Sequence, residues 1–285
     1  MPRTSTIADV VGIVVCLAAT TYFVYTYLPV GVDWVRDGPP SVGMDWKGAF
    51  REACLALLRG ESPYERISFH NPPWVLIPLL PVALLTPALG SAVMYALNLV
   101  AFLIVMVKLR TNLLLIPLLL TFSGMLVNSN NGNIEGLLAL GFVMPPQIGL
   151  FFVLAKPQIG VAVALYWLAE SWRAGGLRKV LLVAGPVLVA YLISFLIFGI
   201  WIGESFQVVD AWWNMSIWPR GIPVGAFLLG MAIWRGEIKF AIAASPLLAP
   251  YLTGHSWAFV LLGLLSLFPP LSFQLGRRRL ANAIP

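Results

Sequence analysis

Charged side chains are scarce in this chain of 285 residues, of which 11% are charged and 59% are hydrophobic. Soluble domains carry about 25% charged residues. A mean hydropathy of +0.87 excludes a water-soluble globule of this size, because its interior could not hold so much apolar surface. The apolar stretches also lack the alternation of apolar and polar residues that membrane β-barrels require. Since backbone groups in lipid must satisfy their own hydrogen bonds, we expect an all-α integral membrane protein.

Cysteine and histidine are also rare. Cys16 and Cys54 are too few for a disulfide framework and form no metal motif. His70 and His255 cannot make a metal site by themselves. The sequence has no glycine-rich phosphate loop and no HExxH motif. We therefore expect no cofactor; a divalent cation is compatible with the sequence, but nothing in it implies one.

Long apolar segments fill most of the chain, and several approach the roughly 20 residues that cross a bilayer. We predict one membrane domain over residues 1–285, built as a polytopic helical bundle of about ten crossings. The apolar segments are 7–30, 74–107, 112–127, 133–145, 147–170, 179–202, 221–234, 238–252 and 256–275.

Proline interrupts two of these stretches. We interpret 74–88 as a re-entrant or interfacial helix and 90–107 as a crossing, because proline and glycine break the run between them. Pro145-Pro146 and Lys156-Pro157 divide the later stretch into short pieces at 133–145, 147–155 and 158–170. The last two are too short to span a bilayer, so we expect half-helices that meet inside the membrane and line a polar cavity opening outward.

Basic residues cluster in short connections, which stay cytoplasmic in membrane proteins. We therefore expect a multi-pass protein of the cell inner (plasma) membrane with both termini in the cytoplasm, and with loops 31–72 and 203–220 outside. This scattering does not suit nucleic-acid binding, which gathers basic residues on one polar surface. The residues assigned inside are Arg3, Lys108, Arg110, Arg173, Arg178, Lys179, Arg235, Lys239, Arg277, Arg278 and Arg279.

The first outer loop is too long to be a simple connector. Within it, apolar residues recur at helical spacing from Lys47 to Arg59, and charged residues occupy the other face. Gly60 follows as a stop signal. We predict an amphipathic helix lying at the membrane surface.

The candidate functional residues all map to the predicted outer side. Lys156 is the sharpest signal, because a Lys at membrane depth costs about 2.5–3.5 kcal/mol on insertion scales. Each candidate also has a structural explanation: Asp45 as a solvated carboxylate, Lys156 as a side chain that reaches the interface, the asparagines as helix caps, and the tryptophans as interfacial anchors. The set comprises Asp45, the run Asn128–Glu135, Lys156, Trp212, Trp213, Trp218, Arg220, Pro250, Tyr251 and His255.

Several motifs resemble a bacterial family of GT-C membrane glycosyltransferases, whose donors are polyprenyl-phosphate sugars, typically mannose. The resemblance begins at Asp45-Trp46-Lys47, continues through Gly60-Glu61-Ser62-Pro63-Tyr64 and reaches Asn71-Pro72-Pro73. Downstream, Gly132-Asn133-Ile134-Glu135 looks like the family's GQxN turn, and Ala155-Lys156-Pro157 looks like its K-P element. The segment 244–251 is similar to its late SP or PY element. Both amides of GQxN are altered here, and the family's YPP reads Asn-Pro-Pro.

This resemblance implies a GT-C-like fold and a sugar transfer to a lipid or glycan acceptor at the outer face. Asp45 would act as the general base, and transfer would invert the anomeric centre. The partners implied are the polyprenyl-phosphate sugar, its acceptor and membrane lipids. The residues implied for the donor phosphate are Lys156, Arg220 and His255, and those for the sugar or acceptor are Asn131, Asn133, Glu135 and Tyr251.

Two other functions fit the same composition. A small transporter would also use proline-broken half-helices, although the hydropathy pattern shows no repeat. A non-catalytic structural or assembly subunit would bind a membrane protein partner, and would leave Asp45 and Lys156 far apart or buried against it. Whether these two residues face one cavity is therefore the discriminating observation.

Overall fold

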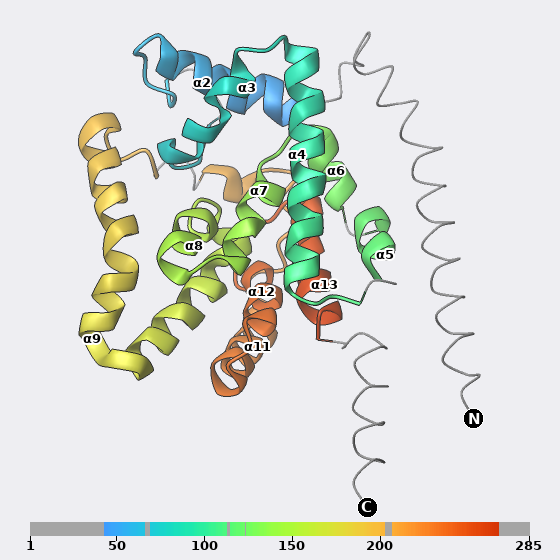
Figure 1. The fold of residues 1–285 in the computed structure, drawn as a ribbon, viewed down its shortest axis with the longest axis vertical. Helices are drawn as coiled ribbons and strands as arrows, with labels where there is room; N and C mark the ends of the chain where they lie inside the picture. Colours follow the sequence, from blue (N-terminus) through green and yellow to red (C-terminus); the bar gives the residue numbers. More distant parts are fainter. Residues whose placement is uncertain (1–42, 66–68, 113–114, 123, 203–206, 268–285) are drawn as a thin grey trace, which may run out of the picture.

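The computed structural model describes residues 43–65, 69–112, 115–122, 124–202 and 207–267. Over these residues every regular element is helical and no strand occurs, as the composition predicted (Figure 1). Residues 1–42 and 268–285 lie outside the described residues. They include the predicted N-terminal span 7–30 with Cys16, the first part of the predicted outer loop 31–72, and Arg277, Arg278 and Arg279.

Two of the described helices are long and apolar enough to cross a membrane. The first, α4 (Pro87–Lys108), has 22 residues, and the second, α9 (Pro157–Phe198), has 42. Helix α4 contains the predicted crossing 90–107 but starts at Pro87, inside the stretch 74–88 that was predicted as a separate helix. It starts there because the Thr86 side chain accepts a hydrogen bond from the Leu89 amide and Pro87 occupies the first turn. Helix α9 bends at Gly175 and Gly176, where the backbone leaves helical geometry.

The expected count of about ten crossings is wrong for the described residues, because the other apolar segments form short helices. A ten-residue helix covers about 15 Å, half of a bilayer core of about 30 Å. Proline and glycine set the breaks; Gly124, for example, has φ +83°. The short apolar elements are α3 (Leu80–Ala83), α5 (Leu115–Phe122), α6 (Met125–Asn131), α7 (Glu135–Ala139), α8 (Pro146–Val153), α11 (Ile222–Arg235), α12 (Ile238–Leu247) and α13 (Ala258–Leu265), with 3-10 turns η2 (Pro73–Val75), η3 (Ile77–Leu79), η4 (Leu140–Val143), η5 (Gln207–Asp210) and η6 (Gly254–Trp257).

The predicted pair of half-helices is only half right. Helix α8 is short, as expected for 147–155, but residues 158–170 belong to a longer helical segment of α9 that runs from Pro157 to the kink at Gly175 and Gly176. The two helices approach closely at Gly160, which has no side chain. A Cβ added there would lie 2.3 Å from the Val153 carbonyl oxygen. This contact sets the tight turn that carries Lys156.

The predicted helix at 47–59 is present as a π-helical turn, η1 (Trp46–Phe50), followed by α2 (Arg51–Leu58). Gly60 follows it with φ +76°, as expected for a helix stop. Its apolar face is buried in the protein core through Trp46, Phe50 and Ala53. The helix therefore covers one end of the bundle.

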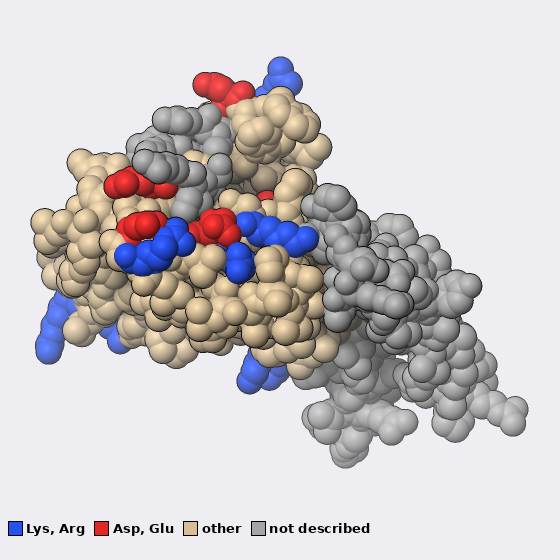
Figure 2. Space-filling model, turned by 90° about the horizontal axis from the view of Figure 1, so that it is seen from above, with Lys and Arg blue, Asp and Glu red and all other residues tan. Residues whose placement is uncertain are grey.

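The loops and bends that carry Lys and Arg side chains lie together at the opposite end of the bundle. The Arg173 guanidinium donates to the Ile233 carbonyl, which joins the bend of α9 to the end of α11. Lys239 Nζ donates to the Ser266 carbonyl at 2.7 Å, and Ser266 Oγ lies 2.6 Å from Thr111 Oγ1, just after α4. These connections lie at the lower end of the molecule in Figure 1. Figure 2 views the other end, where acidic and basic side chains lie together on an otherwise uncharged surface.

Candidate functional site

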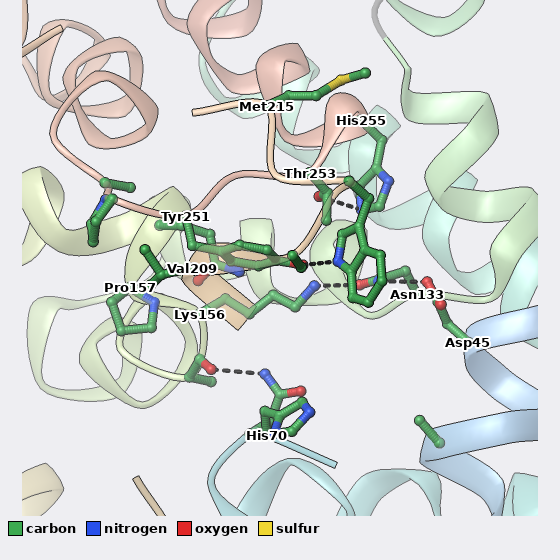
Figure 3. Close-up of a pocket in the computed structure, with 18 of the residues that line it drawn as sticks. Asp45, His70, Asn133, Lys156, Pro157, Val209, Met215, Tyr251, Thr253 and His255 are labelled. Carbon is green, nitrogen blue, oxygen red and sulfur yellow. Dashed lines mark hydrogen bonds between the residues drawn. The ribbon is translucent and has the colours of Figure 1, made fainter. Parts of the chain in front are cut away.

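A cavity of about 1580 Å³ lies at the end of the bundle that carries α2. Its polar residues come from separate parts of the chain: Asp45 before η1, Asn133 after α6, Lys156 before α9, and Tyr251 and His255 after α12 (Figure 3). Its remaining wall is largely apolar and aromatic, so the cavity is amphiphilic. That wall includes Ala49, Phe50, Leu154, Val161, Tyr191, Trp201, Ile202 and Leu248.

Lys156 sits in the turn between α8 and α9, directly before Pro157. The Asn71 side chain holds this turn by donating to the Ala155 carbonyl at 3.0 Å. The Lys156 side chain is nearly buried and donates to Asn133 Oδ1 at 2.7 Å and to Glu135 Oε1 at 3.2 Å. The cation is thus desolvated and paired with a carboxylate inside the protein.

Asn133 connects this cation to Asp45. Its Nδ2 donates to Asp45 Oδ2 at 2.7 Å, while its Oδ1 accepts from Lys156 and from the Ile134 amide at 2.8 Å. Asn98 fixes the backbone here by donating to the Asn133 carbonyl at 2.7 Å. One amide therefore separates the carboxylate from the ammonium and holds both at the cavity surface.

Glu135 is fully buried behind this surface. Its Oε1 also accepts from Ser256 Oγ at 2.6 Å and lies 3.4 Å from His255 Nε2. Burial by itself raises the pKa of the Glu135 carboxyl, but the Lys156 and His255 charges and the hydrogen bonds from His255 and Ser256 outweigh burial and hold the pKa below its usual range. Glu135 is therefore the counter-ion of Lys156.

The structure brings most of the predicted site residues to one cavity. Asp45, Asn131, Asn133 and Lys156 line it, as do Tyr251 and His255. Two predicted residues are placed elsewhere. Arg220 is exposed in the turn before α11 and is not among the lining residues, and Glu135 is buried behind the wall instead of facing a sugar.

The sequence analysis singled out His255 in the turn after Tyr251 but missed its neighbours Thr253 and Ser256. Thr253 Oγ1 lies 3.0 Å from His255 Nε2 and 2.8 Å from Ser256 Oγ, so these side chains form one hydrogen-bonded group beside Glu135. The polar run Thr253-Gly254-His255-Ser256 between two apolar helices was the available signal. Among the described residues, no group of three or more His, Cys, Asp or Glu side chains is placed to hold a metal ion.

No protein-family model, curated protein or solved structure matches this chain. The likeness to GT-C enzymes thus rests on the motifs alone, and the geometry of the cavity must carry any functional proposal.

Proposed function

We propose that this chain is a membrane glycosyltransferase that moves a mannose-like sugar from a polyprenyl phosphate to a hydroxyl of a lipid or glycan acceptor. The observation that carries the proposal is that Asp45 and Lys156 line one cavity, joined through the Asn133 amide. A carboxylate and a cation at a shared, partly desolvated surface are the two charges that this transfer requires.

The surface of α9 supports a membrane location. Only 17% of its most apolar window is buried within the protein. Its second half exposes a row of large aliphatic side chains that water would solvate poorly, at a cost of about 25 cal/mol per Å². Lipid accommodates such a face at no comparable cost. The row includes Leu181, Leu182, Leu188, Val189, Leu192, Ile193, Leu196 and Ile197.

The charge distribution supports an orientation. The basic connections around Lys108, Arg173 and Lys239 meet at one end of the bundle, and the positive-inside rule assigns that end to the cytoplasm. The cavity lies at the other end, where Asp45 and the residues Ala49 and Phe50 of η1 line it. A donor would therefore be used at the outer leaflet of the inner membrane.

The lining of the cavity suits an amphiphilic phosphate donor. Lys156 offers an ammonium for the phosphate, and its counter-ion Glu135 lies on the protein side of it. His255 lines the cavity nearby and can add a hydrogen bond to the same group. The apolar wall formed by residues such as Phe50 and Trp201 suits the first isoprene units of the lipid.

The reaction balances with these residues alone. Asp45 takes the proton of the acceptor hydroxyl as that oxygen attacks the anomeric carbon and forms the new glycosidic bond. The bond between the anomeric carbon and the phosphate oxygen breaks, and the polyprenyl phosphate leaves with the electron pair. Lys156 stabilises the charge that develops on this leaving group. A single displacement inverts the anomeric centre.

One observation favours the alternative of a non-catalytic membrane subunit. Lys156 and Glu135 neutralise each other within the fold, as a purely structural ion pair would. The exposed row on α9 would then pack against a partner helix.

The deciding experiment uses the full chain in lipid nanodiscs with a radiolabelled polyprenyl-phosphate mannose and a membrane lipid and glycan extract as acceptor. The proposal expects label to move from the donor to an acceptor, with release of polyprenyl phosphate. A wild-type protein that neither binds polyprenyl phosphate nor transfers its sugar would favour the structural subunit.

A further inference from the structure

The loop before α11 carries two adjacent tryptophans at the mouth of the cavity. Trp212 is 91% exposed and Trp213 is 45% exposed, and both line the cavity together with Tyr251. The two indole rings meet edge to face, with centroids 5.6 Å apart and an interplanar angle of 86°. Large aromatic faces therefore remain open beside a floor that contains Lys156 and Asn133.

The Asn214 side chain helps to fasten this loop to the segment after α12. Asn214 Nδ2 donates to the carbonyls of Val209 at 2.8 Å and Pro250 at 3.0 Å. Asn214 Oδ1 accepts from the amides of Ser216 at 2.9 Å and Leu252 at 3.0 Å. All the hydrogen-bonding groups of this amide are thus used. Two of the bonds shape the loop itself, and two join it to the segment after α12.

Backbone and side-chain contacts extend the same junction. The Met215 amide donates to the Leu252 carbonyl at 2.7 Å, and Ser216 Oγ donates to the Ala249 carbonyl at 2.5 Å. Trp213 Nε1 donates to Tyr251 Oη at 3.1 Å, which fixes one indole against the phenol. The aromatic rim formed by Trp212, Trp213 and Tyr251 is therefore preorganised. Binding of a ligand that stacks on this rim would cost little conformational entropy, because the loop is already ordered.

The rim differs from an interfacial anchor elsewhere in the chain. An anchoring tryptophan directs its indole N–H toward lipid headgroups, whereas the Trp213 N–H is used inside the protein. Trp234, at the end of α11, has the features of an anchor: it is 72% exposed and lies beside Arg235, whose guanidinium carbon is 5.0 Å from the ring centroid. Trp234 does not line the cavity.

We propose that Trp212, Trp213 and Tyr251 form a subsite for a neutral oligosaccharide, which would be the acceptor if the transferase function holds. A pyranose ring has a face of C–H groups and a rim of hydroxyls. The C–H face stacks on an exposed indole, while the hydroxyls reach the polar floor at Asn133 and Asn131. Burial raises the pKa of Tyr251, so its phenol stays protonated and can donate to a sugar hydroxyl.

The test measures binding of two probes to the full chain in nanodiscs by isothermal titration calorimetry. One probe is a set of neutral trisaccharides built from mannose, glucose or galactose, and the other is farnesyl phosphate. Trp212→Ala and Trp213→Ala should each weaken the best trisaccharide by about tenfold or more, which is 1.4 kcal/mol. Both variants should bind farnesyl phosphate as the wild type does, which also shows that they are folded. Trp234→Ala, which removes an exposed indole outside the cavity, should change neither affinity.

The outcomes separate this subsite from the proposed function. Equal trisaccharide affinity in wild type and both cavity variants would overturn the subsite, as would a wild type that binds farnesyl phosphate but none of the trisaccharides. A wild type that binds a trisaccharide through Trp213 but not farnesyl phosphate would keep the subsite and remove the lipid-phosphate donor. Binding of neither probe would remove both.

Discussion

Lys156 Nζ lies 3.2 Å from Glu135 Oε1, and both side chains are buried. The cation that faces the cavity therefore carries its counter-charge on the protein side. Breaking a buried pair by removing one partner costs about 3–5 kcal/mol, because the other charge is left without compensation. The site and the stability of the fold are linked through this pair.

Replacing Glu135 by Ala should lower the thermal unfolding temperature strongly, because Lys156 loses its counter-ion and Ser256 loses its acceptor. The matched control is Glu61→Ala, which breaks the exposed pair with Arg59 and should cost about 0–1 kcal/mol. Thermal unfolding of both variants in the same detergent measures the difference. Similar shifts for the two would show that the buried pair contributes no more than a surface pair.

The stabilisation by Glu135 should depend on pH in one direction. Its folded pKa is below its unfolded value of about 4.3, so the stabilisation is present above that pH and is lost as the pH falls through the folded pKa. The unfolding temperatures of the wild type and Glu135→Gln should therefore differ most near neutral pH and converge in acid. A gap that stays constant from pH 7 to about 3 would contradict a depressed pKa.

Asp45→Asn tests the general base. The amide keeps the size of the side chain and can still accept from Asn133, but it cannot take the acceptor proton. The transfer rate should fall by about 10²–10⁴-fold, with donor binding retained. Glu65→Gln, at an exposed carboxylate outside the cavity, should leave the rate unchanged. Equal rates for wild type and Asp45→Asn would remove Asp45 from the mechanism.

Lys156→Gln tests the phosphate contact. The substitution keeps a hydrogen-bond donor beside Asn133 but removes the charge, and a charged hydrogen bond contributes about 1.5–3 kcal/mol. Affinity for farnesyl phosphate should therefore fall by about tenfold to a hundredfold. Arg59→Gln, at an exposed cation away from the cavity, should bind normally. Unchanged affinity in Lys156→Gln would assign the phosphate to another residue.

Gly160→Ala tests the close approach of α8 and α9 that positions the Lys156 turn. The added methyl would lie 2.3 Å from the Val153 carbonyl oxygen, and overpacking of this kind costs about 1–3 kcal/mol. The variant should unfold at a lower temperature and bind farnesyl phosphate more weakly. Gly185→Ala, also in α9, meets nothing within 4 Å and should not lower the unfolding temperature. If the two variants behave alike, the contact at Gly160 does not set the turn.

The sequence by itself determined the helical class and several local boundaries. Composition predicted an all-helical chain, and Pro157 and Gly60 marked a helix start and a helix stop that the structure has. These features depend on residue type and immediate neighbours, so they can be read without knowing the fold. Asp45, Lys156 and His255 line one cavity. This agrees with the sequence analysis, which assigned all three to the predicted outer side of the membrane.

The tertiary structure alone decided how many apolar segments become long helices and what each polar residue does. Proline positions indicated the break between α8 and α9, but the close approach of these two helices at Gly160 depends on which backbones pack together. The same holds for Glu135, whose hydrogen-bond partners Lys156 and Ser256 lie 21 and 121 residues away in the chain. A carboxylate's pairing depends on which side chains the fold brings within about 3 Å, and sequence spacing does not contain that information.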